Sequence, residues 1–250
     1  EAKVDLSAYK HIWVFAEQRQ GKLQNVALEL IGEGKRLAKD ISEETQICAV
    51  LMGNNIEHLA QECFEYGADA VYMIQDPILA QYTTDGYTKA LFDAIEEYKP
   101  EIVLYGATHI GRDFAPRIAA RCNTGLTADC THLDVKVSKY IEFAKANTTL
   151  VTSTLDPNSP DKGLKMTRPA FGGNLMATII CPRTRPQMST VRPGVMKKAP
   201  FDQAKADACE IEMYPVTIEK SDLRTEVLEV VKEAKQLVDL IGAEVIVSVG

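Results

Sequence analysis

The stretch 104–117 combines residue types that suit a ligand site at the end of a strand. Thr108 offers a hydroxyl group, Gly111 permits close approach of the backbone, and Arg112 adds a positive charge. An apolar run precedes them and a helical pattern follows, so the free N–H groups of a helix N-terminus would lie beside these side chains. Surface ion pairs among Arg112, Asp113 and Arg117 on the first helical turn account for the same charges equally well, and both interpretations remain open.

Catalysis by a nucleophile or a metal is not indicated by the other reactive residues. His109 is interpreted as a hydrogen-bonding loop residue, because no Ser or Cys nucleophile accompanies it. The cysteines include no Cys-x-x-Cys pair, and this usage is typical of small core residues in a reducing cytoplasm. A zinc signature, a Walker A loop and the Gly-x-Gly-x-x-Gly fingerprint are absent, which disfavours a standalone NAD-dependent oxidoreductase.

Residues 122–131 form a second candidate segment. Small and hydroxylated side chains bracket Gly125, and Thr127 and Asp129 follow it. This composition suits a loop that lies close to a ligand or to another chain. A connector between secondary-structure elements, with hydroxyl groups as caps, explains the segment about equally well.

The third candidate segment, 165–174, contains Arg168 directly before Pro169, which disfavours a helical conformation at the arginine. Gly172 and Gly173 permit a tight bend. A guanidinium presented in this way can hydrogen-bond a cofactor or stabilise negative charge on it. A β-hairpin turn with an exposed arginine is the simpler interpretation of the residues alone.

The first half of the chain alternates strand and helix patterns, which must position these segments. Apolar strands separated by helix-length segments predict an α/β domain, doubly wound in three layers around a mostly parallel sheet. Predicted strands are 11–16, 46–51, 70–74 and 102–106, and predicted helices are 23–39, 56–66, 87–98 and 112–122.

The pattern changes after Asn123, where a β-rich segment is added to this nucleotide-binding-like domain. We expect a first domain over 1–205, and a linker with the start of a second α/β domain over 206–250. Expected strands are 133–137, 148–152, 174–181, 210–218 and 243–249, the polar 156–163 is a loop, the proline-rich 182–202 is irregular, and 223–240 is a helix.

Composition excludes some classes of partner. The net charge of −7 argues against nucleic acid as the main partner. No run of 18 uncharged apolar residues occurs, so a membrane span is not expected. The first residues lack the pattern of a signal peptide, which favours a cytoplasmic location.

Five motifs occur in order along the chain: Ile12-Trp-Val-Phe-Ala-Glu-Gln18, Gly106-Ala-Thr-His-Ile-Gly-Arg-Asp-Phe-Ala-Pro-Arg-Ile-Ala-Ala-Arg121, Thr124-Gly-Leu-Thr-Ala-Asp-Cys130, Thr167-Arg-Pro-Ala-Phe-Gly-Gly-Asn174 and Arg192-Pro-Gly-Val-Met196. Together they resemble the electron transfer flavoprotein alpha subunit, and the resemblance covers about residues 9–250. The fourth motif is similar to the bacterial, anaerobe-associated branch of that family, in which many members bifurcate electrons.

This resemblance implies a heterodimer with a beta subunit and two FAD molecules. One FAD is held by an alpha C-terminal domain whose binding motifs do not occur in this sequence, and the other lies in the beta subunit and accepts hydride from NADH. The motif match puts Arg168 beside N5 of the beta-subunit flavin. Weaker candidates for the same neighbourhood are Gly125, Thr127, Asp129 and Arg112.

The implied role is that of an electron-carrier subunit in an oxidoreductase complex, rather than a standalone enzyme. Electrons would pass to ferredoxin and to an acyl-CoA dehydrogenase or a similar dehydrogenase, with domain motion about the 203–220 linker. A non-redox regulatory module that binds a nucleotide or a partner remains the alternative from a different class.

Overall fold

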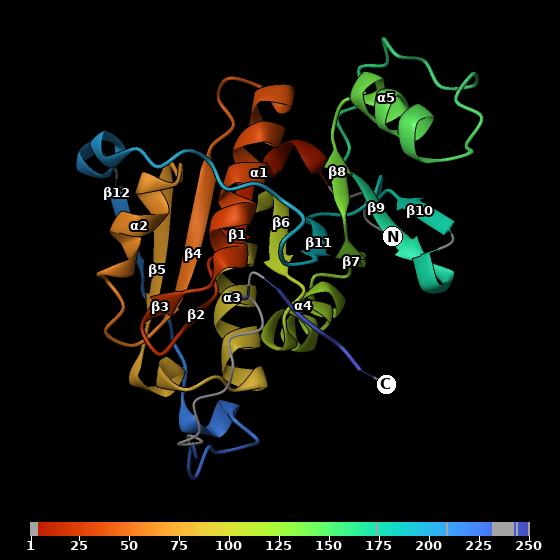
Figure 1. Cartoon of the computed structure of the whole chain (residues 1–250). Coiled ribbons are helices and arrows are strands. Elements are labelled where there is room, and N and C mark those ends of the chain that lie inside the picture. Colours follow the sequence, from red (N-terminus) through yellow and green to blue (C-terminus); the bar gives the residue numbers. More distant parts are fainter. Residues whose placement is uncertain (1–4, 174, 209, 232–242, 244, 250) are drawn as a thin grey trace.

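The computed structural model describes residues 5–173, 175–208, 210–231, 243 and 245–249. Its centre is a seven-stranded sheet in the order β12-β5-β4-β1-β6-β11-β7, and all neighbouring strands run parallel (Figure 1). The strands are β1 (Lys10–Phe15), β4 (Ile47–Gly53), β5 (Ala70–Gln75), β6 (Pro100–Gly106), β7 (Leu126–Cys130), β11 (Gln187–Val191) and β12 (Glu210–Tyr214).

Helices cover both faces of this sheet and make three layers. Side chains of β1 alternate between two apolar cores, because successive residues of a strand point to opposite faces. Ile12 and Val14 pack with α1 and α2, whereas Trp13 and Phe15 pack with α3 and α4. The helices are α1 (Asn25–Ile41), α2 (Leu59–Glu65), α3 (Thr84–Tyr98), α4 (His109–Arg121) and α5 (Val137–Asn147).

A second, antiparallel sheet stands with α5 to one side of the main sheet, beyond β11 and β7 (Figure 1). Its order is β10-β9-β8. The strands are β8 (His132–Asp134), β9 (Lys165–Ala170) and β10 (Leu175–Ile179), and a separate small hairpin consists of β2 (Gln18–Arg19) and β3 (Lys22–Leu23). Short 3-10 helices are Leu6–Ala8, Pro77–Ala80, Phe171–Gly173, Gln203–Ala208 and Lys220–Asp222.

The predicted doubly wound α/β class, with an added β-rich segment, is confirmed, and the elements of the first half lie close to their predicted bounds. None of the helices among the described residues combines the length and apolar character needed to cross a lipid bilayer. The strand β12 pairs with β5, so the main sheet extends past residue 205. The domain division at that residue stays a prediction.

Two predictions for the segment after Asn123 are wrong. The sequence predicts a strand over 133–137, but the observed strand β8 ends at Asp134 and α5 starts at Val137. The helix forms because Val137, Ile141 and Ala144 recur at helical spacing and are buried together. The predicted strand 148–152 is irregular, with Val151 exposed and without a neighbouring strand.

The prediction of an irregular 182–202 is wrong because β11 lies within it, between β6 and the edge strand β7 of the main sheet. Its polar side chains concealed the strand in the sequence. They are buried because each has a partner: Gln187 donates to Glu101 Oε1 at 3.1 Å, and Thr190 Oγ1 accepts from the Asp129 N–H at 2.9 Å. Tertiary hydrogen bonds therefore override the local sequence pattern here.

The predicted helix 223–240 is wrong over 223–231, which is not helical, and the rest of it lies outside the described residues. Arg224 instead forms an ion pair with Asp85 at 2.7 Å. An amphipathic helix needs a surface on which to bury its apolar face, yet Leu228 is exposed. The described part of the predicted strand 243–249 is likewise not in a sheet, with the side chains of 245–249 exposed.

Candidate functional site

The carboxyl ends of β1 and β6 form the switch point of the fold. From here α1 passes to one face of the sheet and α4 to the other, and ligands of open α/β sheets bind at such places. A cleft of about 790 Å³ opens there. Its lining includes Arg19, Asn25, Thr108, His109, Arg112 and Gly194.

Thr108 and Gly111 serve the local structure of this edge. The Thr108 hydroxyl accepts from the Gly111 N–H at 3.0 Å and caps α4, so the helix begins three residues earlier than predicted. A Cβ atom on Gly111 would lie 1.9 Å from the carbonyl oxygen of Gly106. Glycine is therefore required by the contact between α4 and β6.

Glu17 is a buried charge that the sequence analysis missed. Its carboxylate accepts from the Thr108 hydroxyl at 2.5 Å and from Arg19 Nη2 at 2.7 Å, with no exposed area. The only available signal was a glutamate placed directly after an apolar strand pattern. It ties the end of β1 to the N-terminus of α4.

The main charged feature of this edge is a set of guanidinium groups around Asp129. Arg112 Nε donates to the Ala107 carbonyl at 2.8 Å, and its Nη2 lies 3.1 Å from Asp129 Oδ1. Arg192, at the end of β11, binds the same carboxylate through Nε at 3.2 Å and Nη2 at 2.6 Å. The structure thus brings together two residues predicted for the site and adds Arg192, whose only signal in the sequence was its place in the motif Arg192–Met196.

An irregularity in β7 aims the Asp129 carboxylate at these arginines. The register with β11 shifts so that Ala128 and Asp129 both face Thr190. Asp129 has φ +61°, a left-handed conformation that is uncommon for a residue other than glycine. Hydrogen bonds from Arg192 hold the pKa of Asp129 below its usual value, and the charges of Arg112 and Arg168 act in the same direction.

Arg168 belongs to β9 and lies opposite Ala177 of β10. Its charge contributes to the lowered pKa of Asp129, so the two side chains are within electrostatic reach. Arg168 Nε is buried, and in the described part of the chain it has no hydrogen-bond partner. The bend Phe171–Gly173 follows, with positive φ at all of its residues and no atom within 4 Å of a Cβ built on either glycine.

The other two predicted site residues lie elsewhere. Thr127 is buried in β7 beside Ser189, and none of its described contacts reaches an arginine of the cluster. Gly125 precedes β7 at the amino-terminal edge of the sheet, where a Cβ atom on it would lie 3.8 Å from Cys181 Sγ. Their roles in cofactor binding stay predictions.

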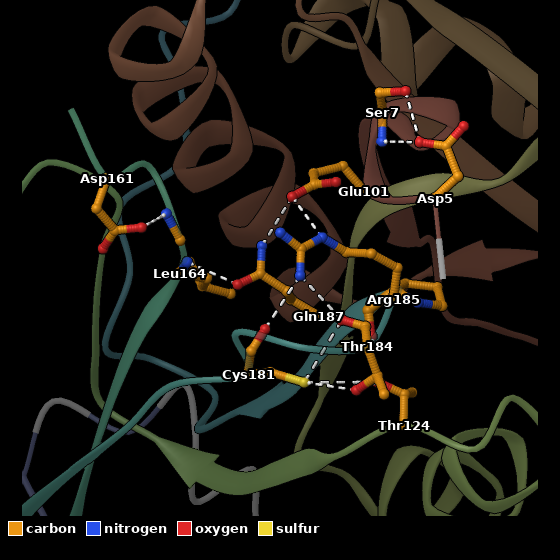
Figure 2. A network of polar contacts seen from close by, with 12 residues as sticks. Asp5, Ser7, Glu101, Thr124, Asp161, Leu164, Cys181, Thr184, Arg185 and Gln187 are labelled. Atoms are coloured by element: carbon orange, nitrogen blue, oxygen red, sulfur yellow. Dashed lines mark hydrogen bonds and ion pairs between the residues drawn. The ribbon is translucent and has the colours of Figure 1, made fainter. Parts of the chain in front are cut away.

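A different polar network occupies that amino-terminal edge. Figure 2 shows the Arg185 guanidinium between the Glu101 carboxylate, at 2.7 Å, and the carbonyl oxygens of Cys181 and Thr184. Gln187 links Glu101 to Leu164: its Nε2 donates to the Glu101 carboxylate, and its Oε1 accepts from the Leu164 N–H at 2.8 Å. Arg185 and Glu101 neutralise each other, and further donors of Arg185 are taken up by carbonyl oxygens, which is typical of a structural network.

Cys181 is part of the same network. Burial raises the pKa of the Cys181 thiol, but hydrogen bonds from Thr184, Thr124 and the Gly125 backbone outweigh burial, and the pKa is lowered overall. Burial raises the pKa of Cys63 to about 12 and that of Cys130 to about 11. Among the described residues no group of three or more His, Cys, Asp and Glu side chains could hold a metal ion.

Comparison with known proteins identifies the family. The sequence of residues 12–219 matches the electron transfer flavoprotein domain. Over 98% of its length the chain is 54% identical to the "Acryloyl-CoA reductase electron transfer subunit beta" of Anaerotignum propionicum, and it covers 66% of that protein. It is 49% identical to the "Electron transfer flavoprotein subunit alpha" of Thermoanaerobacterium thermosaccharolyticum, again over 98% of this chain and 66% of the relative.

A further relative is the "Lactate dehydrogenase (NAD(+),ferredoxin) subunit LctC" of Acetobacterium woodii, 40% identical over 99% of this chain and 52% of that protein. The chain thus spans two thirds or less of the length of these relatives. The word "beta" in the first relative's name differs from the alpha-type names of other relatives. Because the family domain and these relatives match most of the chain, this protein belongs to the electron transfer flavoprotein family, as an alpha-type protein.

Proposed function

We propose that this chain is a cytoplasmic alpha-type subunit that pairs with a beta subunit as a heterodimer and contributes Arg168 to an FAD held largely by that subunit. The observation that carries the proposal is the buried Arg168 Nε without a partner in the described residues. An unsatisfied buried donor costs about 1–3 kcal/mol, which favours an acceptor supplied from outside them. A flavin ring nitrogen or oxygen is such an acceptor.

The charge of the neighbourhood fits the same group. Arg112, Arg168 and Arg192 supply three positive charges, against which Asp129 supplies one negative charge. Fixed guanidinium groups stabilise negative charge on a reduced cofactor and hold it in place. Bound FAD supplies the redox chemistry, since it takes up a hydride and passes electrons on singly.

An exposed apolar surface supports the proposal that this chain contacts a partner subunit. Phe171 is 80% exposed, and large apolar side chains of and near β10 are also exposed. They are Leu175, Met176, Ile179 and Ile180. Exposed apolar groups gathered on one hairpin are typical of a protein–protein contact. In the described residues β10 pairs with β9 alone, so its outer edge retains unpaired backbone groups.

We extend the proposal to electron bifurcation. The complex would oxidise NADH and pass electrons to ferredoxin and, through a second FAD in the alpha C-terminal domain, to an acyl-CoA or similar dehydrogenase. The name of the Acetobacterium woodii relative, which includes NAD(+) and ferredoxin, supports this assignment. The residues that follow β12 would then lead from the main sheet to that C-terminal domain.

The test is to purify the complete natural chain with its beta subunit and to measure the flavin content. Two FAD per heterodimer and bleaching by NADH support bifurcation, whereas one FAD with AMP supports an ordinary carrier. A colourless monomer that is stable alone would favour the regulatory module instead.

Arg168→Ala tests the role of the guanidinium directly. We expect a changed flavin spectrum and weaker flavin retention, with Arg168→Lys intermediate because it keeps the charge but not the planar donors. Arg183→Ala is the matched control, since Arg183 is exposed. An unchanged spectrum together with unchanged reduction by NADH in Arg168→Ala would refute the proposed role.

A further inference from the structure

Among the described residues, Asp129 is the one carboxylate that forms ion pairs with Arg112 and Arg192, and the charge of Arg168 also acts on it. It makes ion pairs with Arg112 and Arg192 at 3.1 and 2.6 Å. The two arginines remain about half exposed, whereas the Asp129 side chain is 21% exposed. The carboxylate therefore forms the inner part of the cluster, and the arginines keep donors free to face outward.

The backbone fixes Asp129 in this position. Its N–H donates to Thr190 Oγ1 at 2.9 Å, and its left-handed conformation lies at the register shift between β7 and β11. Two residues later, the Thr131 N–H donates to the Thr167 carbonyl at 2.9 Å and joins β7 to β9 directly beside Arg168. A strained residue that is held from both sides is typical of a functional site.

We propose that Asp129 balances charge at this site: it offsets part of the positive charge that Arg112, Arg168 and Arg192 present to the flavin. This inference rests on the proposed function and deepens it. Asp129 needs no contact with the cofactor for this role, since it acts through its charge.

This role predicts that removing the negative charge of Asp129 and removing the positive charge of Arg168 shift the flavin potential in opposite directions. Removing the negative charge with Asp129→Asn makes the surroundings more positive, so the preference for reduced over oxidised flavin rises by about threefold to tenfold. Arg168→Ala lowers the same preference. For a two-electron couple a tenfold change corresponds to about 30 mV in midpoint potential. A merely structural role of Asp129 would loosen the arginines and shift the potential in the same direction as Arg168→Ala.

The experiment is a spectroelectrochemical titration of the complete complex with its beta subunit, with flavin retention as a second readout. Asp40→Asn is the matched control, because Asp40 also pairs with two cations, Lys136 and Lys139, but at the far end of α1. We expect a positive shift for Asp129→Asn, a potential close to wild type for Asp129→Glu, and no shift for Asp40→Asn. Thermal unfolding of each variant reports whether it is folded.

Arg192→Gln keeps the inference testable should Asp129→Asn fail to fold, because it removes one positive charge from an exposed side chain and should shift the potential negatively. If Arg168→Ala lowers the potential but Asp129→Asn leaves it unchanged or lowers it, or if Arg192→Gln leaves it unchanged, the inference is overturned and the proposed function stands. If Arg168→Ala has no effect on the flavin, the proposed function fails, and the inference fails with it.

Discussion

The two edges of the main sheet hold arginines in different surroundings. At the amino-terminal edge, the Arg185 side chain is 10% exposed, and its guanidinium is bound by Glu101 and by two carbonyl oxygens. At the carboxyl edge, Arg112 and Arg192 share Asp129, and Arg168 Nε has no partner among the described residues. A charge set that is complete stabilises a fold, whereas one with excess charge and a free donor is suited to bind something else.

Arg185→Ala should give the largest loss of stability. It leaves the carboxylate of Glu101 without its charged partner, so we expect the free energy of unfolding to fall by about 3 kcal/mol. Urea denaturation measures this change, and Arg183→Ala on the same segment should alter it by less than about 0.5 kcal/mol. Equal effects of the two substitutions would show that the Arg185 network does not stabilise the fold.

Cys181 should be the most reactive thiol among Cys48, Cys63, Cys122, Cys130 and Cys181. Burial raises the pKa of the other four to about 11 or 12, whereas that of Cys181 is lowered overall. We expect alkylation at neutral pH to be at least about tenfold faster at Cys181, since the thiolate is the reacting form. Peptide mapping by mass spectrometry measures the rates, and Thr184→Val should slow the reaction by removing a hydrogen-bond donor.

Arg168→Met should leave the chain without its partner as stable as before, or raise the free energy of unfolding by up to about 1 kcal/mol. The substitution removes an unsatisfied buried donor and keeps a side chain of similar length. The same change at Arg185 should be strongly destabilising. A loss of more than about 2 kcal/mol for Arg168→Met would mean that Arg168 has a structural role, and would remove the contrast between the two edges.

Asp129 should make a small contribution to stability that depends on pH. Its pKa is lowered in the folded chain, chiefly by Arg192, so its contribution is complete above the unfolded value of about 4 and is lost as the pH falls through the lower folded value. The arginines are about half exposed, so we expect only about 0.5 kcal/mol at neutral pH. The stability difference between wild type and Asp129→Asn, measured from pH 7 to pH 2, should disappear in acid.

The strands and helices before Asn123 could be predicted because their patterns are local. An apolar run such as 46–51 indicates a strand buried on both faces, and the observed strand Ile47–Gly53 is buried throughout. The missed strand β11 has mixed polarity, and its burial depends on Glu101, Leu164 and Asp129, which lie far away in the sequence. Partners of this kind cannot be read from a single segment.

The sequence alone determined the fold class, the family resemblance and the three candidate segments that contain Arg112, Asp129 and Arg168, because apolar periodicity and short motifs are local properties of a chain. Only the tertiary structure decided which of these residues meet. The pairing of β11 with β7 brings Arg192 to Asp129, and the register shift turns that carboxylate towards the arginines. Strand order and register are set by contacts between distant segments, so the charge balance at each edge appears only in the folded molecule.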